Sequence, residues 1–443
     1  MNHIRLSDHF TIRRLLRFVL PSAGMMIFLS IYSVVDGFFV SNYAGKEAFA
    51  ALNLIFPFPN MLMAFGFMLG TGGSALVAER LGQKRERQAM KIFTMLVKVI
   101  VILAICFTII AEAFMPQAAI FLGADSAMLE DCVIYGRIIA AGIMPFAIQY
   151  YFQSLFVTAG KPNLGFLSTV LAGCTNILGD WILVAGLDLG LAGAAWATVA
   201  SSVVGALIPL LYFSHPNRSN LHFVNCHLDG KALKKAMSNG ASELLSNISA
   251  NIINMLYNAE LMKYAGADGV AAFGVISYAN FIFISLYFGF SMGSAPIVSY
   301  HYGAGNQKEL HSLFEKSLLI IAVCAGVLTF SSYLLSPLIA RIFVGYDTVL
   351  CEMTTHGFRI YAYSFLIIGF NIYASSFFTA LGNGRLSALI SILRTLVFEV
   401  FSILILPQLF GLEGIWWAVT AAEALSLTVS VTCLVRSRDE YGY

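Results

Sequence analysis

The sequence predicts an all-α integral membrane protein in which twelve transmembrane helices form two lobes of six. Three observations support this fold class: a composition poor in charge, twelve apolar segments of spanning length, and an internal repeat. Of the 443 residues, 58% are hydrophobic and only 11% are Asp, Glu, Lys or Arg, whereas a soluble protein carries about 25% charged residues. Because so few charges cannot cover the surface of a soluble protein of this length, most of the chain must face lipid.

The apolar segments are long enough to be membrane spans. A helix needs about 20 apolar residues to cross roughly 30 Å of hydrocarbon. Only the connection between the sixth and seventh segments is long and polar, so we expect an N-terminal lobe at 1–213, a cytoplasmic linker at 214–232 and a C-terminal lobe at 233–443. The expected spans, in order, are 12–41, 48–78, 90–115, 130–157, 163–186, 190–213, 233–263, 269–300, 312–336, 352–381, 386–407 and 412–435.

Lys and Arg residues orient the spans, because cytoplasmic loops carry an excess of them. With the N-terminus inside, 18 of the 26 basic residues fall on the cytoplasmic side, including Arg218 of the linker, and only Lys46, Lys263 and Arg341 fall outside. Both termini are therefore expected in the cytoplasm. The basic stretch 80–91 then lies near anionic lipid and is not a nucleic-acid site.

The two halves of the chain are copies of each other at an offset of about 222 residues. The repeat-equivalent pairs include Gly45 and Gly266, Arg137 and Arg359, Gly160 and Gly382, Gly190 and Gly411, and Trp196 and Trp417. Six spans in each half mean that both copies insert the same way round, with their symmetry axis along the membrane normal. Two such lobes with a cavity between them are the architecture of an alternating-access carrier.

Short segments along the whole chain carry a family resemblance. They are Pro21 with Val35–Gly37, Gly73-Ser74 with Leu81–Lys84, Pro296–Asn306, Ala380–Gly382, Ser391–Arg394 and Phe410–Trp416. In this order within a repeated six-span plan, they resemble the MATE (multidrug and toxic compound extrusion) family. The resemblance implies a MATE/MOP-type fold with a V-shaped cavity, and outward export of amphiphilic organic cations driven by Na⁺ or H⁺ moving inward.

Four oxygen-bearing side chains of the N-terminal lobe are predicted to lie at similar depth. Asp36 lies about 8 Å below the outer membrane surface, Asp180 about 9 Å and Thr198 about 12 Å, and Asn176 is one turn below Asp180. Intramembrane carboxylates are functional candidates, and such oxygens suit Na⁺ or a shared proton. The same four residues match the cation site that the family resemblance implies. The alternative is a buried polar network that only ties the spans together.

The C-terminal lobe offers secondary candidates. Glu399 and Glu423 are candidates either for coupling or for structural ion pairs, and neither role is favoured. Arg394 and Glu399 are five residues apart and do not share a helix face, so each of these two needs a partner on another helix. Asn371 stands where some branches of the family have an acid, which argues against a cation site there. Glu243 lies nearer the cytoplasmic end and is expected to be a hydrated or capping residue.

The remaining predictions concern mechanism and alternatives. Pro21 weakens the hydrogen bonding of the first span and is the expected hinge for moving Asp36. There is no G-x-x-x-x-G-K-[ST] loop, so we expect no cofactor beyond the coupling ion and no enzymatic activity. A flippase for lipid-linked precursors would need several cationic side chains in its cavity, and an intramembrane enzyme would need a nucleophile or metal cluster.

The expected partners follow from this interpretation. They are small organic substrates and membrane lipid, with no nucleic acid, and the expected unit is a monomer in the cytoplasmic membrane. The sequence leaves Na⁺ or H⁺ open as the coupling ion. The nature of the substrates is also left open.

Overall fold

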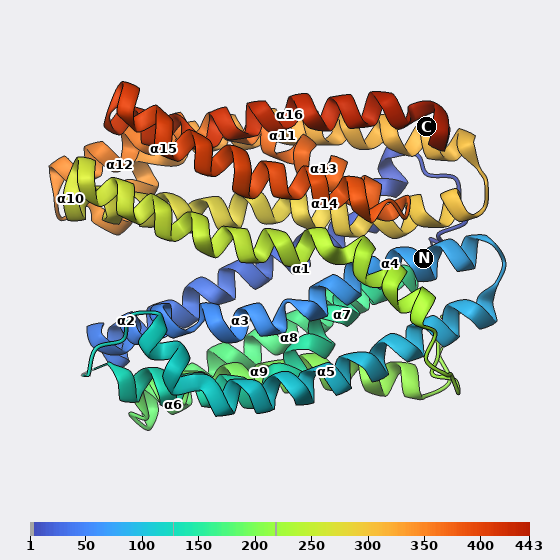
Figure 1. Cartoon of the computed structure of the whole chain (residues 1–443), viewed down its shortest axis with the longest axis horizontal. Coiled ribbons are helices and arrows are strands. Elements are labelled where there is room, and N and C mark those ends of the chain that lie inside the picture. The colour runs from blue at the N-terminus through green and yellow to red at the C-terminus, as the bar shows by residue number, and fades with distance from the viewer. Residues whose placement is uncertain (1–3, 127, 218) are drawn as a thin grey trace.

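The protein is described by a computed structural model that covers residues 4–126, 128–217 and 219–443; Arg218 of the predicted basic set lies outside the described residues. In these ranges the regular elements are helices (Figure 1). The first half contains α1 (Ile12–Phe39), η1 (Val40–Ala44), α2 (Lys46–Ile55), α3 (Pro57–Met63), α4 (Phe65–Gly82), α5 (Glu86–Phe121), α6 (Leu129–Ala141), α7 (Ile143–Thr158), α8 (Pro162–Asp180), η2 (Trp181–Gly186) and α9 (Gly190–Ser214). The second half contains α10 (Gly230–Gly303), α11 (Gln307–Val344), α12 (Thr348–Tyr361), η3 (Ala362–Ser364), α13 (Phe365–Ala380), α14 (Gly384–Ile392), η4 (Leu393–Phe398), α15 (Glu399–Phe410) and α16 (Leu412–Tyr441).

The predicted all-α fold class is confirmed. Among the described residues, ten helical segments are long and apolar enough to cross a membrane, and α6 with α7, bent by 54°, makes another. The 74-residue α10 supplies two of the twelve spans, because at 1.5 Å per residue it would otherwise be several times longer than the bilayer is thick. It turns at Gly266, whose φ of 61° and ψ of −151° are not helical, between the predicted spans 233–263 and 269–300.

The internal repeat is visible in the backbone. Three pairs of glycines that the offset of about 222 residues makes equivalent all have positive φ: Gly45 and Gly266, Gly160 and Gly382, and Gly190 and Gly411. Positive φ is strained for residues with a Cβ, and glycine adopts it freely. Each pair ends or begins a helix at the same place in both lobes, so the two copies fold with the same turns.

Buried apolar side chains form one cluster in each lobe, and the first span, α1 continued by η1, takes part in both. Leu15, Phe18 and Val19, before Pro21, belong to the C-terminal cluster, whereas Val40, after α1, belongs to the N-terminal one. The α1 helix therefore crosses from one lobe to the other, with Pro21 inside the crossing segment. Because proline removes one backbone hydrogen bond, the helix is weakest near this crossing.

The two lobes meet most closely at one end of the molecule. The described part of the chain begins and ends here (Figure 1), and we call this end the terminal face. There the Lys235 ammonium of α10 lies 2.8 Å from the Glu79 carboxylate of α4. Nearby, Gly72 and Gly240 bring the backbones of α4 and α10 together, since a Cβ on Gly240 would collide with the Met68 carbonyl oxygen.

Candidate functional site

The structure brings the four predicted side chains of the N-terminal lobe together. The Asn176 amide donates to Thr198 Oγ1 over 3.2 Å, and Thr198 Oγ1 donates to Asp36 Oδ1 over 3.4 Å. Asp180 and Asn176 are 0% and 1% exposed, while Asp36 and Thr198 are half-buried. Residues from the first, fifth and sixth spans therefore form one oxygen cluster, in which Asp180 is a close neighbour of Asp36.

Several oxygens of this cluster lack a hydrogen-bond partner. Within the described part of the chain, neither carboxylate oxygen of Asp180 is hydrogen-bonded, and neither is Asn176 Oδ1. Leaving such oxygens buried and unpaired is costly, and a bound cation or proton would remove the cost. Two carboxylates with amide and hydroxyl oxygens are ligands that a hard monovalent cation such as Na⁺ accepts, so the residues present fit either coupling ion.

Small residues allow the three spans to approach each other. A Cβ on Gly173 of α8 would lie 2.5 Å from the Phe28 ring and 2.8 Å from the Tyr32 ring of α1, and one on Gly179 would lie 2.7 Å from Ala197 Cβ of α9. In addition, α8 ends at Asp180 and continues as the π-helical turn η2. Such π-helical turns occur often at functional sites, where they redirect side chains.

The C-terminal lobe contains a closed polar network. Arg394 Nε lies 2.7 Å from Glu423 Oε1 on α16, and the Asn371 amide donates to Glu423 Oε2 over 2.7 Å. Ser430 Oγ in turn donates to Asn371 Oδ1 over 2.8 Å. The partner that Arg394 needed on another helix is therefore Glu423, and Asn371 is fully engaged in holding that ion pair.

Breaking this network from one side should strongly destabilise the protein. Glu423→Gln leaves the Arg394 charge, 11% exposed, without its counter-charge, and we expect a loss of about 3 kcal/mol or more. The measurement is the thermal unfolding midpoint in detergent. The double variant Arg394→Gln/Glu423→Gln removes both charges and should recover most of the loss; a double variant no more stable than the single one would contradict the ion-pair explanation.

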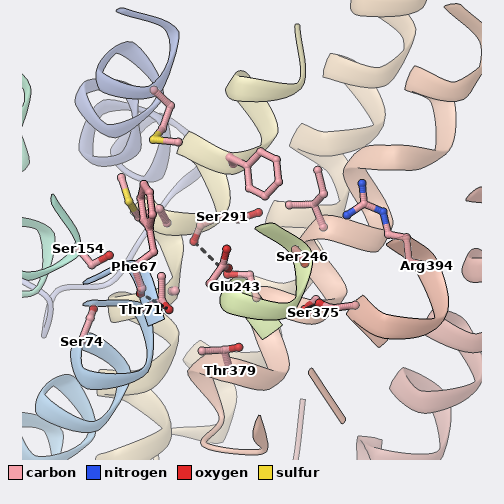
Figure 2. A pocket seen from close by; sticks show the side chains of 17 residues that line it. Phe67, Thr71, Ser74, Ser154, Glu243, Ser246, Ser291, Ser375, Thr379 and Arg394 are labelled. Carbon is pink, nitrogen blue, oxygen red and sulfur yellow. Dashed lines mark hydrogen bonds between the residues drawn. The ribbon is translucent and has the colours of Figure 1, made fainter. Parts of the chain in front are cut away.

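The other two candidate acids of this lobe, Glu399 and Glu243, form no ion pair with any of the described residues. Glu399 begins α15 directly after the π-helical turn η4. Glu243, half-buried on α10, faces a cavity between the lobes (Figure 2). The packing of α10 against α4 turns this face of the helix toward the other lobe, and the expectation of a hydrated or capping residue at Glu243 stays a prediction.

The cavity that Glu243 faces is lined by both lobes. Met and Phe side chains share its wall with hydroxyl groups, and Arg394 lies on the side away from α4 (Figure 2). The hydroxyls include Thr71, Ser74, Ser154, Ser246, Ser291 and Ser375. Sequence reasoning did not predict these residues, because Ser and Thr are common in membrane helices and often bond to their own backbone, as Thr71 does to the Phe67 carbonyl. No pattern in the sequence separates the lining hydroxyls from the others.

A family model, a relative and two solved structures all match this chain over most of its length. The MatE family model matches residues 21–182 and 244–404. Multidrug export protein MepA of Staphylococcus aureus (strain MRSA252) is 24% identical over 435 residues, which covers 96% of this chain and 94% of that protein. A MOP superfamily transporter from Pyrococcus furiosus matches with a TM-score of 0.93 at 22% identity, over 100% of this chain and 99% of the other, and that transporter is described as having a binding pocket of reverse polarity that suggests a different function. An outward-facing multidrug resistance MATE family transporter matches with a TM-score of 0.92 at 22% identity, over 100% and 98%.

The matched segments agree with the two-lobe architecture. One lies within each lobe, and together they cover most of the chain. The first contains Asp36, Asn176 and Asp180, and the second contains Asn371 and Arg394. The likeness to the solved structures extends over the whole fold. The chain therefore belongs to the MatE family of membrane transporters.

Proposed function

We propose that this protein is a secondary active multidrug exporter that moves amphiphilic, often cationic, organic compounds out of the cell in exchange for Na⁺ or H⁺. The observation that carries the proposal is the set of unpaired oxygens on Asp180 and Asn176 beside Asp36. Asp36 lies on α1, whose other half packs in the C-terminal lobe. An ion bound at this cluster therefore acts on a helix that contacts both lobes. The relative from Staphylococcus aureus, named as a multidrug export protein, supports the substrate class.

The cycle depends on a bistable α1. With the cation bound, the charge of the cluster is compensated and α1 settles in one conformation. Without it, the uncompensated carboxylates disfavour that conformation, α1 bends near Pro21, and the cavity becomes available to substrate. Antiport requires only that the two ligands prefer different conformations of the same protein.

The cavity favours organic substrates over lipid-linked pyrophosphate. Glu243 and the hydroxyl groups offer a carboxylate and hydrogen-bonding partners, and Met26, Met292 and Phe67 offer adaptable apolar contacts. The charge of Arg394 is already compensated by Glu423. A flippase for pyrophosphate-linked precursors would instead need several free cations in the wall.

We propose that the terminal face lies in the cytoplasm of a cell whose cytoplasmic membrane holds the protein. The excess of Lys and Arg at this end supports that orientation. The oxygen cluster and the cavity are each complete within one chain. The functional unit is accordingly a monomer.

Transport by purified protein in liposomes tests this function. A fluorescent organic cation is loaded and its movement is followed while Na⁺ and pH gradients are imposed separately, with no nucleotide present. We expect at least one gradient to drive transport, because the proposed energy source is an ion. Transport that ignores both gradients but follows added ATP would contradict the proposal, and protein-free liposomes give the leak rate.

A further inference from the structure

A second pocket lies on the terminal face, apart from the cavity and the oxygen cluster. It is formed where the start of α10 meets the turn between α13 and α14. Its lining includes Lys231, Lys234, Lys235, Asn239, Gly382 and Arg385. The proposed transport cycle assigns no role to this pocket.

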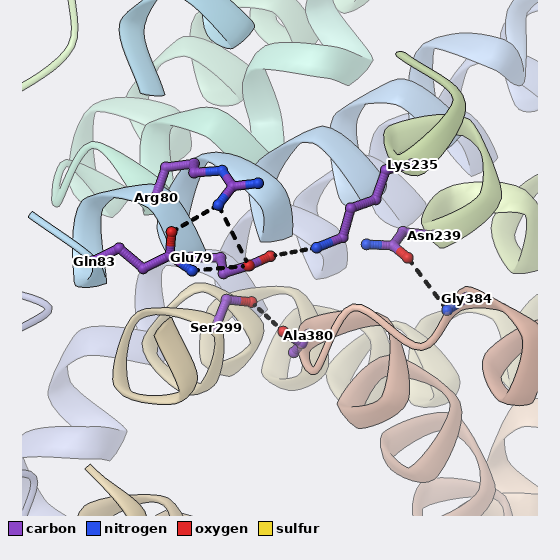
Figure 3. A network of polar contacts seen from close by, with 8 residues as sticks. All are labelled: Glu79, Arg80, Gln83, Lys235, Asn239, Ser299, Ala380 and Gly384. Carbon is purple, nitrogen blue, oxygen red and sulfur yellow. Dashed lines mark hydrogen bonds and ion pairs between the residues drawn. The ribbon is translucent and has the colours of Figure 1, made fainter. Parts of the chain in front are cut away.

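The lining is strongly basic. Four of its side chains are cations, and the lining residues that the structure describes include no carboxylate. Lys235 is half-buried and paired with Glu79 of the other lobe (Figure 3). Lys231, Lys234 and Arg385 are exposed and have no ion-pair partner within the described ranges. The pocket therefore keeps a net positive charge.

The NH₂ group of a buried amide in the pocket has no hydrogen-bond partner among the described residues. Asn239 is 2% exposed, and its Oδ1 accepts from the backbone N–H of Gly384 over 3.2 Å (Figure 3). Because a backbone N–H can only donate, the oxygen of the amide must face Gly384 and the NH₂ group must face away from it. That Nδ2 is unpartnered in the described part of the chain, so a hydrogen-bond acceptor is missing there.

Gly382 leaves the space that such an acceptor would occupy. A Cβ on this residue would lie 3.6 Å from Lys235 Nζ and 3.9 Å from Asn239 Nδ2. An ammonium and an amide donor thus face the same small space above a residue without a side chain. Beside them begins α14, whose N-terminus adds partial positive charge.

We infer that this pocket binds an anionic phosphate group, with Asn239 and Lys235 as inner donors and Lys231, Lys234 and Arg385 as outer cations. Charge-assisted hydrogen bonds favour phosphate oxygens over neutral acceptors. On the terminal face of a membrane protein the phosphate has two possible sources, the headgroup of an anionic phospholipid or a free phosphate compound. The inference concerns binding and does not depend on the transport cycle.

The test compares two charge-matched double variants of the full-length protein in detergent. Lys234→Gln/Arg385→Gln removes two exposed cations of the pocket. Arg87→Gln/Lys91→Gln removes the same amount of exposed positive charge elsewhere on the terminal face. Binding of inorganic pyrophosphate is measured by calorimetry, and retention of phosphatidylglycerol relative to phosphatidylcholine by native mass spectrometry. We expect the pocket variant to weaken binding about tenfold and the control to change it little.

A third variant tests the amide itself. Asn239→Asp keeps the acceptor for Gly384 and the shape of the side chain, but it replaces the free donor with a negative charge and should abolish binding. Loss of pyrophosphate binding alone identifies a free phosphate ligand, loss of phosphatidylglycerol retention alone identifies a headgroup, and loss of both means that the phosphate alone is recognised. Three results would each overturn the inference. They are the absence of binding of either probe to the wild-type protein, an equal loss of binding in the pocket and control variants, and unchanged binding by Asn239→Asp.

Discussion

Export driven by an ion gradient should fall to the leak rate in Asp36→Asn, while the protein still inserts and folds. The substitution keeps the size of the side chain and the oxygen that accepts from Thr198, but it removes the charge that would attract the proposed coupling ion. Moving a two-state equilibrium from 1:99 to 99:1 needs about 5.5 kcal/mol of differential binding. A cluster left with Asp180 as its only carboxylate would bind the ion too weakly to supply this energy.

The measurement is the export rate in liposomes under separate Na⁺ and pH gradients, with size-exclusion profiles as the check on folding. Asp180→Asn should behave similarly and Thr198→Ala should be milder, since a hydroxyl carries no charge. Asp188→Asn, at an exposed loop position of the same lobe, is the matched control and should export normally. Wild-type export by Asp36→Asn under both gradients would exclude the N-terminal site and turn attention to Glu399 and Glu423.

The second large effect is expected from Gly240→Ala. The added methyl group would collide with the Met68 carbonyl oxygen of α4. Because that oxygen belongs to the backbone of α4, it cannot move aside as the end of a flexible side chain can. Overpacking of this kind costs about 1–3 kcal/mol. The strain falls only on the conformation in which the lobes touch at the terminal face, so we expect the equilibrium to shift roughly 5- to 150-fold toward a conformation open at that face.

Spin labels report this shift directly. With cysteines at the exposed positions Arg87 and Lys234 in a background without native cysteines, the distance between the labels should lengthen in Gly240→Ala, and export should fall. Gly274→Ala, in the second of the two spans of α10, is the control, because its added Cβ meets no atom within 4 Å in the described structure. An unchanged distance distribution in Gly240→Ala would show that this contact does not control closure.

Much of the fold follows from the sequence because lipid imposes a simple rule. Every spanning segment must be helical and apolar over a fixed length, so hydropathy along the chain is enough to predict the spans. The offset of about 222 residues predicts the two-lobe repeat, and the positive φ of Gly45 and Gly266 shows it in the backbone. Carboxylates within spans are rare, which is why Asp36 and Asp180 stand out as candidates in the sequence itself.

Other features depend on which side of each helix faces the other lobe. The sequence places Glu243 on a span, but only the packing of α10 turns it toward the cavity. The pairing of Arg394 with Glu423 also joins residues on different helices, and periodicity along one helix does not specify a partner on another.

The sequence by itself thus determined the fold class, the repeat and the identity of the charged candidates. The tertiary structure alone decided which polar atoms stay unpaired, as at Asp180 and Asn239, and where backbones touch, as at Gly240. The physical reason is that hydrophobicity acts on each segment independently and is readable along the chain. Hydrogen bonds and close contacts act over a few ångströms between residues distant in sequence, so they exist only once the helices have packed.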